Sequence, residues 1–84
     1  MNNNEFTYIK EVAKQKSFSK ASKALGISQP ALSNYIKKLE DRMGVLLFDR
    51  SISPIEITEF GKAYLVGESV FKQKMSELEL DGLV

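Results

Sequence analysis

The sequence predicts a mainly α-helical domain, in which a three-helix core is followed by a two-stranded β-hairpin and then by a long helix. Three observations lead to this prediction. Apolar residues recur at helical spacing, glycine and serine residues mark breaks between the helical segments, and two short β-suited runs flank a Ser/Pro turn. The 84 residues are enough for one small domain.

Composition argues against several functional classes. The chain contains no cysteine and no histidine, so it lacks disulfides, thiolate metal ligands and the commonest general base. Nothing approaches 18 consecutive apolar residues, and the first five residues do not resemble a secretory signal. We therefore expect a cytoplasmic protein that is not an enzyme, uses no metal or cofactor, and has no membrane partner.

Positive charge is concentrated in the first half of the chain. From Lys10 to Arg50, nine Lys or Arg residues stand against four Asp or Glu residues, whereas residues 51–84 contain three basic and six acidic residues. The formal net charge of +1 hides this asymmetry. A basic first half favours a polyanion, such as nucleic acid, as the ligand of that part of the chain.

Two helices are expected before residue 26. The first runs from about Glu5 to Lys16 after an Asn3 or Asn4 cap, and its inner face has helical spacing: Phe6, Ile9, Val12 and Ala13. The second runs from a Ser19 cap to about Leu25, and its inward-facing residues are expected to be Ala21, Ala24 and Leu25.

A tight turn at Gly26 and a third helix follow. Ser28 caps this helix, and its first turn tolerates Pro30 because first-turn N–H groups have no intrahelical partner. Spacings of four, three and four residues define its buried face: Leu32, Ile36, Leu39 and Met43. The opposite face is mostly polar, and Gly44 is expected to end the helix. This is the layout of a helix-turn-helix whose second helix enters a major groove.

The β-hairpin is predicted from residues 45–50 and 55–58, which flank the turn at residues 51–54. It would form a wing that packs on the helical core through Leu46 or Leu47, Phe48 and Ile57. Thr58 then caps a helix of about 22 residues, roughly 33 Å long. The prediction is thus a winged helix-turn-helix domain over residues 1–58 and a linker or dimerisation helix over residues 59–84.

The last helix carries a nearly heptad apolar stripe. One small domain cannot cover its whole length, so the far half is predicted to be a self-association surface. The predicted dimer-interface residues are Tyr64, Val70, Phe71, Met75 and Leu78. The alternative is packing on the chain's own domain, which fits residues 60–64 better than residues 71–78.

Residues 17–33 and 36–50 resemble the signature of LysR-type transcriptional regulators, and residues 57–61 resemble the stretch that follows the wing in that family. The resemblance implies a winged helix-turn-helix domain that dimerises through its linker helix and binds an interrupted inverted repeat of double-stranded DNA. In that family a C-terminal domain senses a small-molecule effector. We expect this chain to be the DNA-binding fragment without that domain, or alternatively a natural short protein.

Base recognition is predicted at the start of the third helix. The Gln29 amide can pair with adenine. The resemblance implies that this position takes part in base recognition, although Gln29 could instead support the helix cap. Pro30 offers an apolar edge to a thymine methyl group, and Ser33 and Asn34 lie one turn further along. Many members of the family have arginine where this chain has Asn34.

The remaining predicted contacts are to phosphates. Lys37 and Lys38 lie on the outward face of the third helix, where the alternative is simple solvation. The start of the second helix favours a phosphate through its dipole. Arg50, whose family counterpart contacts the DNA backbone, could instead pair with Glu40 or Asp49. The set is completed by Ser19, Lys20, Ser28, Arg50, Ser51 and Ser53.

The wing contains no positive charge after Arg50, so we expect it to contribute weakly. Specificity would then depend more on Gln29, Ser33 and Asn34. The alternative function is a winged helix that serves only protein–protein contacts, which Lys37 and Lys38 on the recognition face argue against.

Overall fold

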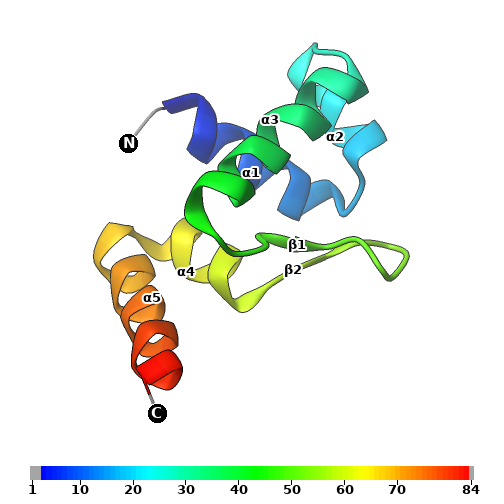
Figure 1. Cartoon of the computed structure of the whole chain (residues 1–84). Coiled ribbons are helices and arrows are strands. Elements are labelled where there is room, and N and C mark those ends of the chain that lie inside the picture. The colour runs from blue at the N-terminus through cyan, green and yellow to red at the C-terminus, as the bar shows by residue number, and fades with distance from the viewer. Residues whose placement is uncertain (1–2, 84) are drawn as a thin grey trace.

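The computed structural model describes residues 3–83, and the side chains of residues 4–78 within that range. Its elements are α1 (Asn3–Gln15), α2 (Phe18–Leu25), α3 (Gln29–Met43), β1 (Phe48–Asp49), β2 (Glu56–Ile57), α4 (Glu59–Val66) and α5 (Glu68–Leu83). The first three helices pack together, the hairpin extends beside them, and α5 projects away from the domain (Figure 1). The predicted mainly helical architecture with a two-stranded wing is confirmed.

Side-chain caps fix where three of the helices begin. The hydroxyl oxygens of Ser28 and Thr58 accept from the N–H groups of Ala31 and Gly61, both at 3.2 Å, as the sequence predicted. The cap of α2 is Ser17 and not Ser19, because the helix begins at Phe18 and Ser17 accepts from the Lys20 N–H at 3.1 Å. Helices α2 and α3 end at left-handed glycines, Gly26 and Gly44.

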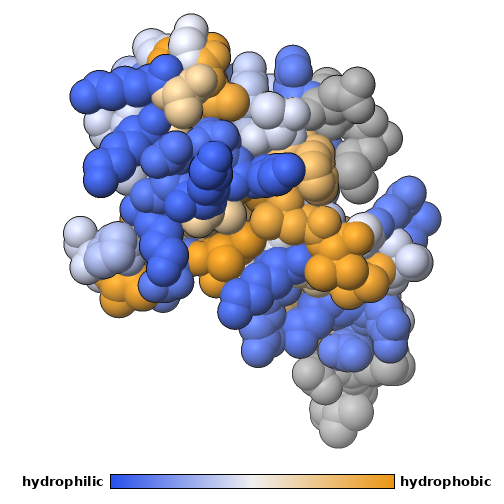
Figure 2. All heavy atoms as spheres, turned by 180° about the vertical axis from the view of Figure 1, so that it is seen from behind, coloured by the Kyte–Doolittle hydropathy of each residue, from blue (hydrophilic) through white to orange (hydrophobic). Residues whose placement is uncertain are grey.

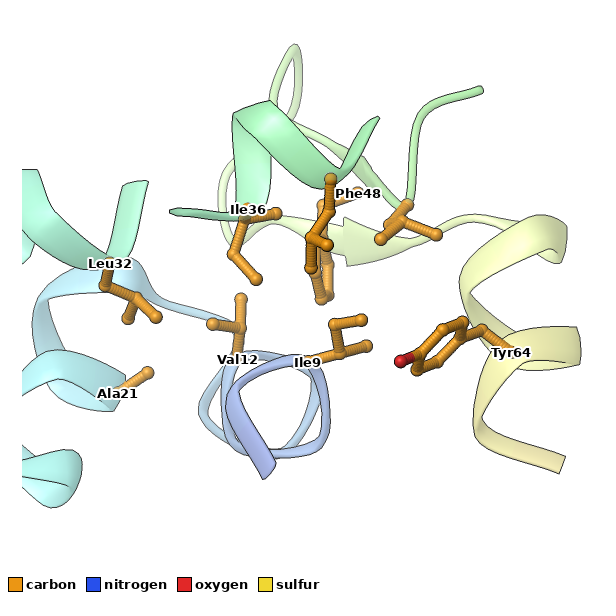
Figure 3. Close-up of a cluster of buried hydrophobic side chains, with 9 residues drawn as sticks. Ile9, Val12, Ala21, Leu32, Ile36, Phe48 and Tyr64 are labelled. Atoms are coloured by element: carbon orange, nitrogen blue, oxygen red, sulfur yellow. The ribbon is translucent and has the colours of Figure 1, made fainter. Parts of the chain in front are cut away.

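The core lies where α1, α3, β1 and α4 meet. Figure 3 shows its side chains converging from all of these elements, together with Ala21 of α2: Ile9, Val12, Leu32, Ile36, Phe48 and Tyr64. Of the two candidate wing leucines, Leu47 is buried and Leu46 is 59% exposed. Both Leu47 and the next residue, Phe48, are buried, so the two consecutive side chains enter the core together where the chain bends into β1. Ala24, expected to face inward, is exposed.

The wing meets the start of α4 at a close backbone approach. The two strands pair antiparallel, with Phe48 opposite Ile57, and the Thr58 N–H donates to the Leu47 carbonyl at 2.9 Å. A Cβ atom on Gly61 would lie 2.5 Å from both the Ile57 side chain and the Leu47 carbonyl oxygen. Glycine at this position therefore lets α4 pack directly under the hairpin.

The single long helix expected after Thr58 is divided at Gly67. The Gly67 N–H donates to the Ala63 carbonyl at 3.1 Å and closes α4, and the Gly67 carbonyl accepts from the Phe71 N–H at 3.0 Å and starts α5. Glycine favours helix less than any residue except proline, so a break there costs little. Helix α5 packs against α4 through the Tyr64 and Phe71 rings, 5.7 Å apart, and an ion pair of Lys74 with Glu59 at 3.0 Å.

Tyr64 belongs to the core, which corrects its assignment to an exposed dimer interface. Its side chain lies among the core residues (3% exposed), and its hydroxyl donates to Glu5 at 3.1 Å. Arg42 of α3 donates to the other Glu5 oxygen at 2.8 Å. Burial and the Glu5 carboxylate raise the pKa of the Tyr64 hydroxyl. This network connects α1, α3 and α4.

A buried carboxylate connects α3 to the wing. The Glu40 side chain is 4% exposed, and its Oε2 atom accepts from the backbone N–H groups of Leu47 at 2.7 Å and Phe48 at 3.2 Å. Its Oε1 atom lies 2.9 Å from an Arg50 guanidinium nitrogen. The chain from α3 to β1 therefore folds around this one carboxylate.

Replacing Glu40 with alanine should lower the free energy of unfolding by about 2–3 kcal/mol, because two buried N–H groups lose their acceptor. Arg50 is 37% exposed, so water can solvate its charge and the penalty stays below that of a fully buried ion pair. Urea unfolding measures the change. As a control, Lys72→Ala breaks an exposed pair with Glu68 and should cost about 0.5 kcal/mol or less. Equal losses in both variants would contradict the structural role of Glu40.

Candidate nucleic-acid interface

The first turns of α3 present the predicted base-contact residues to solvent. Gln29, Pro30 and Asn34 are exposed, and Ser33 is half-buried. The opposite face of α3 is held in the core, since Leu32, Ile36 and Leu39 are buried and Met43 is half-buried. The helix is therefore fixed in position with its polar face outward.

A groove, here called the α3 groove, runs along α3 on the side of the wing. Four predicted contact residues line it: Ser33, Asn34, Lys37 and Arg50. Four residues that were not predicted contacts complete the lining: Phe18, Glu40, Asp41 and Leu46. Lys38 lies elsewhere, in a depression with Glu5, Tyr35 and Arg42. Lys37 and Lys38, which were both predicted on the outward face of this helix, therefore line different depressions beside α3.

A second groove, here called the α2–wing groove, lies between the start of α2 and the tip of the wing. Four predicted contact residues from three segments line it: Ser19, Lys20, Gln29 and Ser53. All four are exposed. Among the other residues that line the groove, three polar residues at the end of α1 and in the turn after it were not among the predicted contacts: Gln15, Lys16 and Ser17. The local pattern gave no sign of them, because only the tertiary fold brings the end of α1 to the wing.

Arg50 is held in place while part of its side chain stays accessible. It makes the ion pair with Glu40 that the sequence allowed as an alternative, and its guanidinium lies 4.9 Å from the centre of the Phe18 ring. The guanidinium has five donors, so contacts with Glu40 leave capacity for another acceptor. Arg50 is therefore an oriented cation at the edge of the α3 groove.

The wing turn uses some of its own polar groups. The Asp49 carboxylate accepts from both the N–H and the hydroxyl of Ser51, and these bonds lower the pKa of Asp49. The Ser51 hydroxyl hydrogen is thus used within the wing and is not directed outward. Ser53 lies in the α2–wing groove, and Ile52 is 47% exposed beside it.

Hydrophobic side chains also reach the surface near the C-terminal end. Val66, Val70 and Leu78 are exposed, whereas Phe71 and Met75 are half-buried. Figure 2, seen from behind, shows hydrophobic side chains at the surface where α4 and α5 join the rest of the molecule, with hydrophilic side chains around them. Within residues 3–83, no helix is long and apolar enough to cross a membrane.

Comparison with known proteins identifies the family. The model described as "Bacterial regulatory helix-turn-helix protein, lysR family" matches residues 4–62. The HTH-type transcriptional regulator BudR of Klebsiella aerogenes is 49% identical over 57 residues, which are 68% of this chain and 40% of that protein. A probable RuBisCO transcriptional regulator of Thalassiosira pseudonana is 46% identical over 57 residues, 68% of this chain and 19% of that protein. The chain thus spans less than half the length of these relatives.

Solved structures agree with this match. A crystal structure titled as a complex of BenM_DBD with catB site 1 DNA has a TM-score of 0.74 and 28% identity, and the match covers 98% of this chain and 86% of that one. The CbnR_DBD–DNA complex has a TM-score of 0.70 and 33% identity, and the match covers 98% of this chain and 87% of that one. With the family model covering most of its length, the chain belongs to the lysR family of bacterial regulatory helix-turn-helix proteins.

Proposed function

We propose that this chain binds double-stranded DNA sequence-specifically as a homodimer and is the DNA-binding part of a bacterial transcriptional regulator. The main support is the start of α3, where Gln29, Pro30 and Asn34 are exposed on a helix whose other face is buried. Similar domains of BenM and CbnR have been crystallised with DNA. The matched residues are 40% and 19% of the two relatives named above, and regulation of the whole protein by a small-molecule effector is proposed from the family resemblance alone.

Base reading is assigned to the first two turns of α3 in the major groove. The Gln29 amide has a donor and an acceptor that match N7 and N6 of adenine, and Pro30 can contact a thymine methyl group. Asn34 and the half-buried Ser33 follow one turn later. Because the Ser28 cap and the buried face fix the helix, the backbone positions of these residues are set before DNA binds.

Phosphate contacts are assigned to both grooves beside α3. Lys37 and Arg50 lie in one groove, and Ser19 and Lys20 lie at the start of α2 in the other, where the helix dipole favours a phosphate. Ser28 uses its oxygen to accept the capping bond, so its hydroxyl hydrogen can still donate to a phosphate. Lys38, on the other side of α3, would reach the opposite edge of the major groove.

Two copies are needed because one small domain makes few phosphate contacts and binds weakly at physiological salt. Two half-sites of an interrupted inverted repeat would raise the affinity through effective concentration. The proposed interface lies on α5, where Val70 and Leu78 are exposed and Phe71 and Met75 are half-buried.

Gln29→Ala should weaken binding to a duplex selected by the wild type by about 1–3 kcal/mol and leave binding to random duplexes nearly unchanged. Gln29 is exposed, so the substitution should not affect folding. Fluorescence anisotropy titrations measure both affinities, and Gln73→Ala on exposed α5 is the matched control. Equal losses on both duplexes would remove Gln29 from base reading. Failure of the wild type to bind any duplex at low salt would contradict the proposed function.

Val70→Glu and Leu78→Glu should each convert the dimer to a monomer, because a charge would be placed in an apolar contact. Both side chains are exposed in the single chain, so neither change should unfold the domain. Sedimentation equilibrium measures the mass. Leu46→Glu, which changes an exposed leucine outside α5, should leave the dimer intact. A monomeric wild type at high micromolar concentration would refute this interface.

A further inference from the structure

Lys16, in the turn between α1 and α2, adopts an unusual backbone conformation. Among residues 3–83 it is the one non-glycine residue with a positive φ, 53°. Left-handed backbone costs a lysine about 1 kcal/mol, whereas glycine and asparagine adopt it more readily. The turn itself needs only the Lys16 N–H, which donates to the Val12 carbonyl at 2.8 Å. The geometry of the turn therefore does not explain why this residue is lysine.

The side chain lies at the functional surface. Lys16 lines the α2–wing groove together with the proposed DNA contacts Lys20, Gln29 and Ser53. Its ammonium group is 3.7 Å from a carboxylate oxygen of Glu56 on β2, and the two side chains are 54% and 48% exposed. In Figure 1 the turn between α1 and α2 lies on the same side of the molecule as the projecting hairpin.

The wing lacks positive charge, and Lys16 is a cation close to it. Residues 51–58 contain no lysine or arginine and one acidic residue, Glu56. A DNA strand that contacts both Lys20 and Ser53 must cross the α2–wing groove, and Lys16 is a second cation there. An exposed ion pair contributes little to stability, so a phosphate can replace Glu56 as the partner of Lys16.

We propose that Lys16 is a further phosphate-contacting residue, which supplies from the end of α1 the positive charge that the wing lacks, and that Glu56 restrains it in the free protein. This inference rests on the proposed DNA binding. Lys16 then contributes to DNA affinity independently of base sequence, and Glu56 weakens DNA binding by pairing with Lys16.

The test uses Lys16→Asn, which removes the charge and suits the left-handed backbone. Binding to a labelled random-sequence duplex is titrated at several salt concentrations. The slope of log K against log salt should become shallower by about 0.9 for each bound subunit, with an affinity loss of about five- to tenfold per subunit near 0.1 M salt. A wild-type-selected duplex should show the same loss, and Lys16→Arg should restore both values.

Control variants distinguish a phosphate contact by Lys16 from an effect on folding and from a change in net charge elsewhere. Lys16→Asn and Lys16→Gly should melt at or above the wild-type temperature, since both residues relieve the backbone. The pair Lys72 and Glu68 on α5 is also exposed, with 3.3 Å between its charged atoms, so Lys72→Asn and Glu68→Gln are matched changes away from the groove. Neither should alter the salt slope.

Glu56→Gln should tighten binding by about two- to fivefold, the range for release of an exposed ion pair. The gain should be smaller when Lys16 is already asparagine. If Glu56→Gln weakens DNA binding, then Glu56 holds the wing in place and does not restrain Lys16. The proposed restraint of Lys16 by Glu56 is then overturned. If the wild type binds but Lys16→Asn keeps its affinity and slope, the role of Lys16 is overturned alone. If the wild type binds no duplex, the proposed function fails first.

Discussion

The arrangement of the recognition surface depends on the contacts of the buried Glu40 carboxylate. A charge buried to this extent must be compensated, and here two backbone N–H groups at the entrance to β1 and the Arg50 guanidinium compensate it. Glu40 lies in the last turns of α3, so this side chain adds a polar connection between the helix and the wing to the packing of Phe48 in the core. Arg50, which also lies over Phe18, is oriented by the same contact. The α3 groove is therefore formed before any ligand binds.

A second network fixes the direction in which the chain leaves the domain. Glu5 of α1 accepts from Arg42 of α3 and from Tyr64 of α4, so the position of α4 is tied to that of the recognition helix. Helix α5 is held less firmly, by the Tyr64–Phe71 ring contact and the Glu59–Lys74 ion pair beyond the break at Gly67. For the proposed dimer, the geometry of each half is thus set in the core, and the relation between the two halves is set at α5.

Most features controlled by local chemistry could be predicted from the sequence, although the cap of α2 at Ser17 and the break at Gly67 were not, whereas contacts between distant segments could not be predicted. The caps at Ser28 and Thr58, the glycine ends of α2 and α3 and the buried face of α3 follow from rules that act over one or two turns. The break at Gly67 was missed because the apolar stripe continues on both sides of it. Tyr64 was predicted in the dimer interface, with packing on the chain's own domain as the alternative, and no local pattern indicated its hydrogen bond to Glu5, 59 residues away. The proximity of Lys16 to β2 could not be predicted from the sequence, because only the fold brings the two together.

In the proposed dimer, two copies of α3 read two related half-sites. Selection of bound sequences from a pool of random duplexes tests it most directly. We expect an enriched inverted repeat, with half-site centres about 10 base pairs or a multiple of that apart, because two symmetric recognition helices must meet the same face of the duplex. Enrichment of no sequence, or of one unrepeated half-site, would contradict it.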